Sequence, residues 1–268
     1  MKKAILIMLI LFSGFTYAKK FKFLRGPKMK VPAHYPKVKD IKAWGKNIAV
    51  KYPRYVRSIR YGYSWEGLKR KEKNLIAVEI RDNKYKPKTW FLITAAIHAR
   101  ELMTTYTAVK FTKLILNKIK NGDKKIKQFL RKCGFIIMPL LNPDGYKMAL
   151  KGWNWRKSTH IYRRFPLSWA PNSYGVNFNQ NFNIHFRRIY KMTNLNWGGP
   201  YPFSEPESRA IRDYLKNKNV FISIALHSYG RLIAYPPWGL LRRSIRLKDK
   251  RRHFIIGRAL QKVMYKYR

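Results

Sequence analysis

The chain has 268 residues, a length that suits one large domain with a sizeable core. It carries 59 Lys and Arg residues against 12 Asp and Glu, a formal net charge of +47, and its single cysteine excludes an intrachain disulfide. This charge would attract phosphate- or carboxylate-bearing polymers in a salt-dependent way, or it reflects a compositional bias of the source organism. Because the charge is spread along the whole chain and no nucleic-acid-binding module is recognisable, no specific nucleic-acid partner is expected.

The N-terminus predicts export from the cell. Lys2 and Lys3 precede an apolar run at residues 4–12, and Ala18 follows at a position typical of signal-peptide cleavage. Residues 1–18 are therefore predicted to be a signal peptide of a secreted or periplasmic protein. The run is shorter than the ~20 residues that cross a bilayer, so no transmembrane segment is expected after cleavage.

Past the signal peptide, residues 19–45 are basic and contain three prolines, which predicts an arm on the surface rather than an element of the core. Residues 46–268 would form the main domain, and we expect a monomer. In that domain, residues 75–80 and 90–97 are β-rich runs separated by a polar turn, which predicts neighbouring strands.

A helix is predicted at 102–119, a buried strand at 135–141 and a turn at Asn142-Pro143-Asp144-Gly145. A long irregular stretch at 151–202 is typical of a functional loop. A helix at 204–217 would begin with Ser204 as N-cap and Glu207 completing a capping box. Strands at 220–226 and 231–235 and a helix at 252–267 follow. Strands alternating with helices predict an α/β fold, a mixed, mostly parallel sheet flanked by helices on both faces.

Histidine and glutamate residues at the strand ends predict a metal site. His98 and Glu101 stand three apart where the strand at 90–97 runs into a helix, and His227 follows the strand at 220–226. In α/β sheets ligands bind beyond the carboxyl ends of the strands, so these three side chains should face one site. Two imidazoles and a carboxylate, with a fourth position for water, suit a hydrolytic Zn²⁺.

After His98 and Glu101, further sequence motifs follow in a fixed order. Together they resemble the zinc carboxypeptidases of the carboxypeptidase A type, from about Tyr61 to the C-terminus. The blocks are Asn142-Pro143-Asp144-Gly145-Tyr146, Trp155-Arg156-Lys157, the run at 175–182 (GVNFNQNF), the run at 202–207 (PFSEPE) and Leu226-His227-Ser228-Tyr229.

The resemblance implies a function for several residues. His98, Glu101 and His227 would hold zinc, and Arg156 would stabilise the oxyanion that develops on the scissile carbonyl. The substrate-binding positions would be Arg100, Asn179 and Gln180. The turn at 142–145 and Glu205 would be structural.

The sequence departs from the family pattern at three places. Asn177 replaces an Asp that normally orients a ligand histidine, which would lower metal affinity by about 10–100-fold. Gln180 replaces an Arg that clamps the free C-terminal carboxylate, and an amide lacks the charged bidentate fork of Arg. The family's general-base Glu and mobile Tyr lie beyond the last residue, so we expect a domain that is incomplete at the C-terminus, with an open sheet edge.

Two functions are compatible with these features. The first is a secreted zinc metallocarboxypeptidase that hydrolyses peptide bonds at or near a C-terminus with a zinc-activated water, acting on peptides or on the peptides of peptidoglycan. The second is a catalytically inactive carboxypeptidase-like protein that binds anionic envelope polymers or peptides. Salt dependence discriminates between them, since binding by charge alone disappears at physiological ionic strength.

Overall fold

A computed structural model describes residues 30–152, 157, 175–184, 186–189, 194–228, 230, 232–234 and 247–266. The predicted signal peptide, residues 19–29 of the predicted arm, and Arg156 lie outside these ranges. The ends of the predicted strand at 231–235 also lie outside, and residues 232–234 form no strand.

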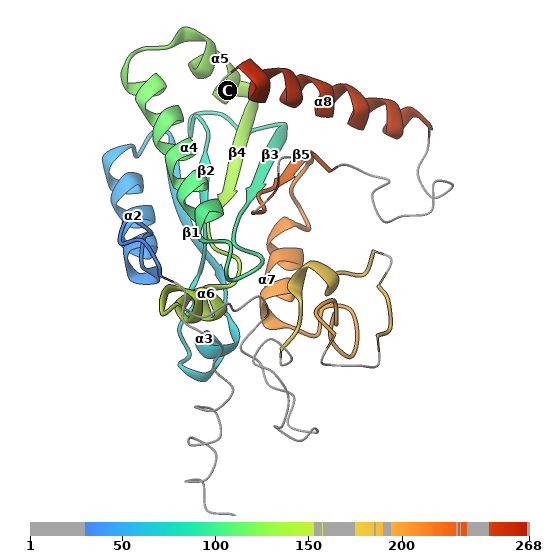
Figure 1. Cartoon of the computed structure of the whole chain (residues 1–268). Coiled ribbons are helices and arrows are strands. Elements are labelled where there is room, and N and C mark those ends of the chain that lie inside the picture. Colours follow the sequence, from blue (N-terminus) through green and yellow to red (C-terminus); the bar gives the residue numbers. More distant parts are fainter. Residues whose placement is uncertain are drawn as a thin grey trace, which may run out of the picture.

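One five-stranded sheet forms the centre of the molecule (Figure 1), with the strand order β1-β2-β4-β3-β5. Its strands are β1 (Val56–Gly62), β2 (Leu75–Ile80), β3 (Thr89–Thr94), β4 (Cys133–Met138) and β5 (Val220–Ala225). β3 pairs in parallel with β4 and β5, while β2 is antiparallel to both β1 and β4. Four of the five strands therefore run in the same direction, and the predicted mixed sheet is confirmed.

One predicted neighbour relation is wrong. β2 and β3 are consecutive in sequence, but β4 lies between them and pairs with both. The segment between β3 and β4 forms helices α4 and α5, so β4 can return through a crossover connection and run parallel to β3. The polar turn at 82–89 is consequently a connection that passes over β4.

Helices flank both faces of the sheet. They are α2 (Val38–Lys51), α3 (Trp65–Lys69), α4 (Leu102–Lys120), α5 (Lys124–Lys132), α6 (Pro143–Leu150), the 3₁₀ turn η1 (Phe178–Gln180), α7 (Pro206–Leu215) and α8 (Leu247–Lys266). Figure 1 shows α2, α4 and α5 on one side and α7 on the other, in agreement with the helix-to-strand contacts. Among the helices of the described residues, none is long and apolar enough to cross a membrane.

The core is divided by the alternation of side chains along the strands. On β4, Ile137 packs in the cluster under α4 and α5, whereas Ile136 and Met138 pack in the cluster under α7. On β3, Ile93 and Leu92 divide in the same way. Successive residues of a strand point to opposite faces, so a strand covered on both sides is apolar throughout.

Helix α2 crosses the predicted boundary at residue 45 without a break. Val38 and Ile41, which were expected in a surface arm, are buried with Ile76 of β2 and Tyr146 of α6. The prolines of this region all precede residue 38, so they leave the i, i+3 apolar spacing of the helix intact. Residues 38–45 therefore belong to the core and not to an arm.

Two helix starts differ from the predictions. The Asn-Pro-Asp-Gly segment begins helix α6, with the Asn142 side chain as N-cap accepting from the Gly145 N–H and Pro143 in the first turn. Helix α7 begins one residue later than expected, with Glu205 at the N-cap position, and the predicted capping box is wrong. The Ser204 hydroxyl donates to Glu205 and accepts from Asn181 instead.

The short helix α3 is held by side chains from three parts of the chain. Its N-terminal N–H groups donate to the Glu207 carboxylate from Trp65 (2.8 Å), to the Asp144 carboxylate from Glu66 (2.9 Å) and to the Ser64 hydroxyl from Gly67 (3.1 Å). The first two acceptors belong to α7 and α6, and Ser64 is the N-cap residue of α3. Negative groups are favourable at the start of a helix, and here they also tie α6 and α7 to α3.

Glu207 is fully buried, and its second carboxylate oxygen has no hydrogen-bond partner among the described residues. Burial, and after it the nearby Glu205 carboxylate, raise the pKa of Glu207 well above the ordinary value. Burial also raises the pKa of Asp144. At neutral pH the folded chain must therefore keep a proton on Glu207 or hold a poorly solvated charge.

We expect Glu207→Gln to stabilise the protein at pH 8 and to change little near pH 4. The amide oxygen can still accept from the Trp65 N–H. The raised pKa of Glu207 lowers the free energy of unfolding by about 1.4 kcal/mol for each pH unit above ~4.3, where the carboxyl group ionises in the unfolded chain but stays protonated in the folded one, and Gln removes this loss. Melting temperatures at both pH values should show a gain of a few degrees only at the higher pH. Glu66→Gln, at a partly exposed carboxylate, is the control, and an equal gain there would contradict this explanation.

Candidate metal centre

The chain leaves β3 through a sharply turned segment that delivers His98 and Glu101. Ala96 is fully buried and has φ of 51°, in the left-handed region that residues other than Gly adopt uncommonly. Its N–H donates to the Thr104 hydroxyl (2.9 Å), which donates in turn to the Glu101 carbonyl (2.6 Å). Its carbonyl accepts from the Asn142 N–H (3.2 Å). The strained turn is thus fastened to α4 and to the start of α6.

His98, Glu101 and His227 converge as the sequence predicts. Their ligand atoms all lie within 4.8 Å of one another. The Glu101 carboxylate lies between the two rings, with one oxygen 2.7 Å from Nδ1 of His98 and the other 3.0 Å from Nδ1 of His227. The ring centroids are 4.9 Å apart.

Parallel pairing explains the convergence. Thr94 and Ala225, the last residues of β3 and β5, are partners, and the Leu226 N–H continues the ladder to the Thr94 carbonyl. The segments that follow both strands therefore emerge side by side, with His98 in one and His227 in the other. His98 and Glu101 are buried, whereas His227 is exposed, so the site opens towards solvent at that side.

The Glu101 carboxylate is the negative centre of the group. Burial acts to raise its pKa, but hydrogen bonds and charge interactions with His227 and His98 outweigh burial and lower the pKa to about 2. Glu101 also occupies the N-cap position of α4, although its side chain makes no capping hydrogen bond there. The carboxylate is therefore directed to the histidines rather than to the helix.

The 3₁₀ turn η1 carries the predicted substrate-binding positions Asn179 and Gln180. Asn179 is exposed and Gln180 is partly buried. Both ends of the buried Asn177 amide are used within the same loop, since its nitrogen donates to the Leu195 carbonyl (3.0 Å) and its oxygen accepts from the Asn179 N–H (3.1 Å). In this structure Asn177 thus shapes the loop that presents Asn179.

Asn181 is a positioning residue that the sequence analysis did not single out. Its fully buried amide donates to the Gly198 carbonyl and the Ser204 hydroxyl, and accepts from the Ser208 hydroxyl and the Glu205 N–H. One side chain thus joins η1 to the start of α7. The only available sequence signal was its place at the end of the Asn-rich run.

The remaining predicted positions are less defined. Arg100, which lies between His98 and Glu101 in the sequence, is partly buried. Lys157, next in sequence to the undescribed Arg156, is buried, and its carbonyl accepts from the Asn142 side chain (2.9 Å). The same Asn142 caps α6, so the loop at 157 is anchored beside the segment that follows β4.

Comparison with known proteins shows the family to which the chain belongs. The family model described as zinc carboxypeptidase matches residues 41–266, and the chain belongs to this family. It is 27% identical over 211 residues to carboxypeptidase O of Bos taurus, covering 75% of this chain and 52% of the relative. It is 30% identical over 196 residues to carboxypeptidase A4 of Mus musculus, covering 71% and 44%. The chain thus spans about half the length of these curated relatives.

Solved structures show the same architecture. Thrombin-activatable fibrinolysis inhibitor superposes with a TM-score of 0.70 at 25% identity, covering 84% of this chain and 54% of that chain. A carboxypeptidase A from Helicoverpa armigera, at 21% identity, has a TM-score of 0.60 and covers 82% and 54%. The predicted fold class and family resemblance are confirmed.

The conformation of Ala96 should limit which residues this turn accepts. We expect Ala96→Val to lower the free energy of unfolding by about 1–3 kcal/mol, because a β-branched side chain is disfavoured at positive φ. Ala96→Gly should stay within about 1 kcal/mol of the wild type, since glycine adopts this conformation without steric strain. Chemical denaturation measures both. A large loss in the glycine variant would show that packing of the methyl group, and not backbone strain, dominates.

Proposed function

We propose that the chain is part of a secreted zinc metallocarboxypeptidase that hydrolyses peptide bonds at or near the C-terminus of peptides, including the peptides of peptidoglycan. The observation that carries the proposal is the convergence of two imidazoles and one carboxylate at the end of a parallel strand pair, in a chain of the zinc carboxypeptidase family. The signal-like N-terminus supports export.

The three side chains fit a zinc ion. Ligand atoms about 2.0–2.2 Å from a tetrahedral Zn²⁺ lie about 3.4 Å from one another, and the observed cluster needs only a small contraction to reach this. The Nδ1 atoms of both rings already face the carboxylate. A zinc ion held there would polarise the scissile carbonyl and lower the pKa of a bound water.

The substrate roles come from the family resemblance. Arg156 would place a fixed positive charge where negative charge develops on the scissile carbonyl oxygen. Asn179 would donate to the terminal carboxylate from its exposed position on η1, and Arg100 would contact the neighbouring part of the substrate. Gln180 would offer a neutral amide, so the terminal carboxylate would be held less firmly than by an Arg.

The test of the proposed ligand set is the zinc content of the intact protein after His98→Ala. We expect the bound zinc to fall from about one equivalent to a small fraction, because one of three protein ligands is lost. His34→Ala is the matched control, as His34 lies outside the cluster and its ring packs beside those of Tyr35 and Tyr106. Unchanged zinc in the His98 variant would refute the proposed site.

A second test addresses the substrate. Gln180→Arg in the intact protein should lower KM for peptides with a free C-terminal carboxylate by about tenfold, since a charged hydrogen bond is worth about 1.5–3 kcal/mol. Peptides with an amidated C-terminus should gain nothing. Equal effects on both substrates would show that Gln180 does not face the terminal carboxylate.

A further inference from the structure

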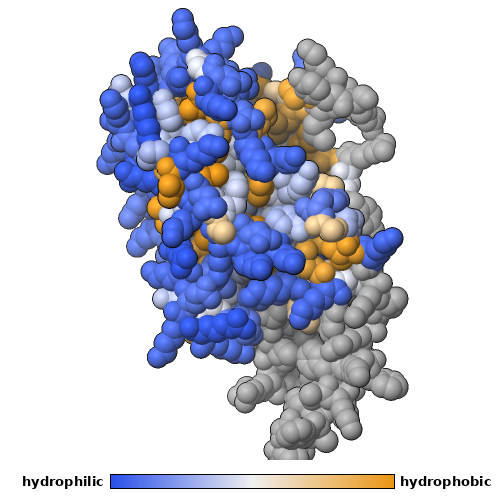
Figure 2. All heavy atoms as spheres, turned by 90° about the vertical axis from the view of Figure 1, so that its left-hand side faces the viewer, coloured by the Kyte–Doolittle hydropathy of each residue, from blue (hydrophilic) through white to orange (hydrophobic). Residues whose placement is uncertain are grey.

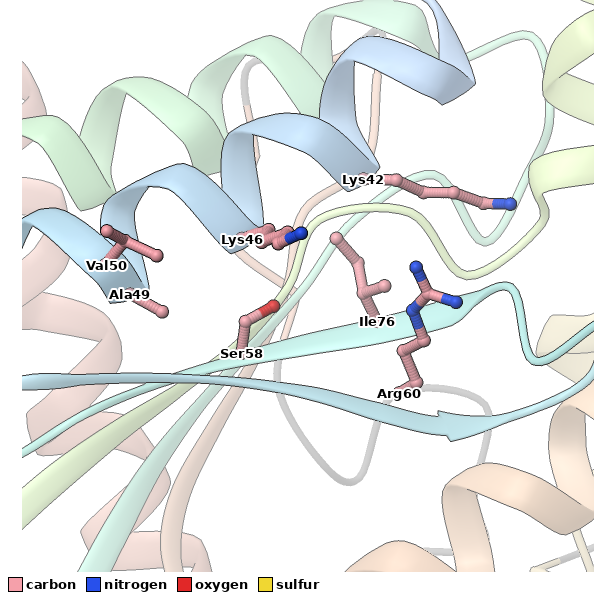
Figure 3. Close-up of a pocket in the computed structure, with 7 residues that line it drawn as sticks. All are labelled: Lys42, Lys46, Ala49, Val50, Ser58, Arg60 and Ile76. Carbon is pink, nitrogen blue, oxygen red and sulfur yellow. The ribbon is translucent and has the colours of Figure 1, made fainter. Parts of the chain in front are cut away.

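A basic pocket lies between α2 and β1, near the sheet edge opposite β5 (Figure 3). It has a volume of about 340 Å³ and is lined by Lys42, Lys46, Ala49, Val50, Ser58, Arg60 and Ile76. β1 and β3 are three strand spacings apart, about 14 Å at ~4.8 Å per spacing, so this pocket is separate from the proposed zinc site. Helix α2 lies on the left-hand side of Figure 1, and this side faces the viewer in Figure 2. The surface seen there is mainly hydrophilic.

The spacing of residues along α2 and β1 places the polar side chains in the lining of the pocket. Lys42 and Lys46 stand four residues apart on α2 and thus on one helix face. Ser58 and Arg60 stand two residues apart on β1 and thus on one strand face, and Figure 3 shows both rising towards α2. Gly45 lets the helix approach the sheet closely, since a Cβ there would lie 3.0 Å from the Ser58 hydroxyl.

The pocket holds more positive charge than its surroundings neutralise. Lys42 forms an ion pair with Glu72, whose pKa is lowered by that hydrogen bond and by the charges of Lys42 and Arg60. Lys46 and Arg60 form no ion pair with any residue that the structure describes. Three cationic side chains thus share one carboxylate, Glu72, and the pocket keeps a net positive charge beside the Ser58 hydroxyl group.

Apolar side chains complete the lining of the pocket. They are Ala49 and Val50 of α2 and the buried Ile76 of β2, and Val50 is 72% exposed. A phosphate ion occupies much less than 340 Å³, and pockets of about 300–1,000 Å³ suit small organic ligands. The space therefore fits an anionic head with an organic body rather than a bare ion.

We propose that this pocket binds the phosphate group of an organic phosphate. The Arg60 guanidinium presents a planar fork that matches phosphate oxygens, the Lys46 and Lys42 ammonium groups add positive charge, and the Ser58 hydroxyl donates one further hydrogen bond. The organic part lies against Val50 and Ala49. Such a phosphate occurs in a free small molecule or as the repeating unit of a polymer, and the two sources are distinguishable by experiment.

Isothermal titration at fixed ionic strength tests the proposal with three probes: inorganic phosphate, glycerol 3-phosphate and poly(glycerol phosphate). We expect glycerol 3-phosphate to bind more tightly than inorganic phosphate because of the apolar side chains in the lining. Lys46→Gln combined with Arg60→Gln should weaken its binding at least tenfold, about 1.4 kcal/mol. Tighter binding of the polymer per phosphate unit would identify the polymer as the source, and equal binding would identify the free phosphate.

The matched control is Arg57→Gln combined with Lys113→Gln. It removes the same charge, but Arg57 lies on the opposite face of β1 and Lys113 is an exposed residue of α4. Melting temperatures of both double variants check that the fold is retained. Equal weakening by the two double variants would show attraction by net charge alone and would overturn the proposal, as would the absence of glycerol 3-phosphate binding in the wild type.

Discussion

The parallel pairing of β3 with β5 is the constraint on which the candidate site depends. It brings together two segments that are more than 120 residues apart in sequence, and it places His98 and His227 beyond the same edge of the sheet. The third member, Glu101, needs only the local turn at Ala96 to reach them. A parallel pair requires a crossover connection, and here that connection contains β4 and several helices, so the meeting of the histidines is a long-range contact of the fold.

Half of the 12 acidic residues of this basic chain are buried. Glu101 accepts from two histidines, Asp144 and Glu207 accept from the first turn of α3, and buried Glu79 accepts from Tyr214 and Lys218. In a chain with a net charge of +47, a carboxylate on the surface would do little to reduce the long-range repulsion. A buried carboxylate, in contrast, satisfies backbone or side-chain donors that would otherwise be left without a partner.

The sequence predicts local features of this fold better than it predicts pairings. The strand at 75–80 and the start of the helix at residue 102 are confirmed because apolar runs and helical spacing are local signals. The insertion of β4 between β2 and β3 depends on tertiary contacts that no short pattern contains. The predicted capping box of α7 was wrong for the same reason, because the Ser204 hydroxyl accepts a hydrogen bond from Asn181, 23 residues away in sequence. The convergence of His98, Glu101 and His227 was predictable because strand ends define the site in α/β sheets.

The place of His227 after β5 has a thermodynamic consequence. β5 is the least covered strand, with alternate residues exposed and Phe221 at 66% exposure, and among the described strands it pairs only with β3. A ligand that binds only the folded state adds RT ln(1 + [L]/Kd) to its stability. An ion held jointly by the segments after β3 and β5 would therefore act as a cross-link, and metal binding and the attachment of this outer strand would be linked equilibria.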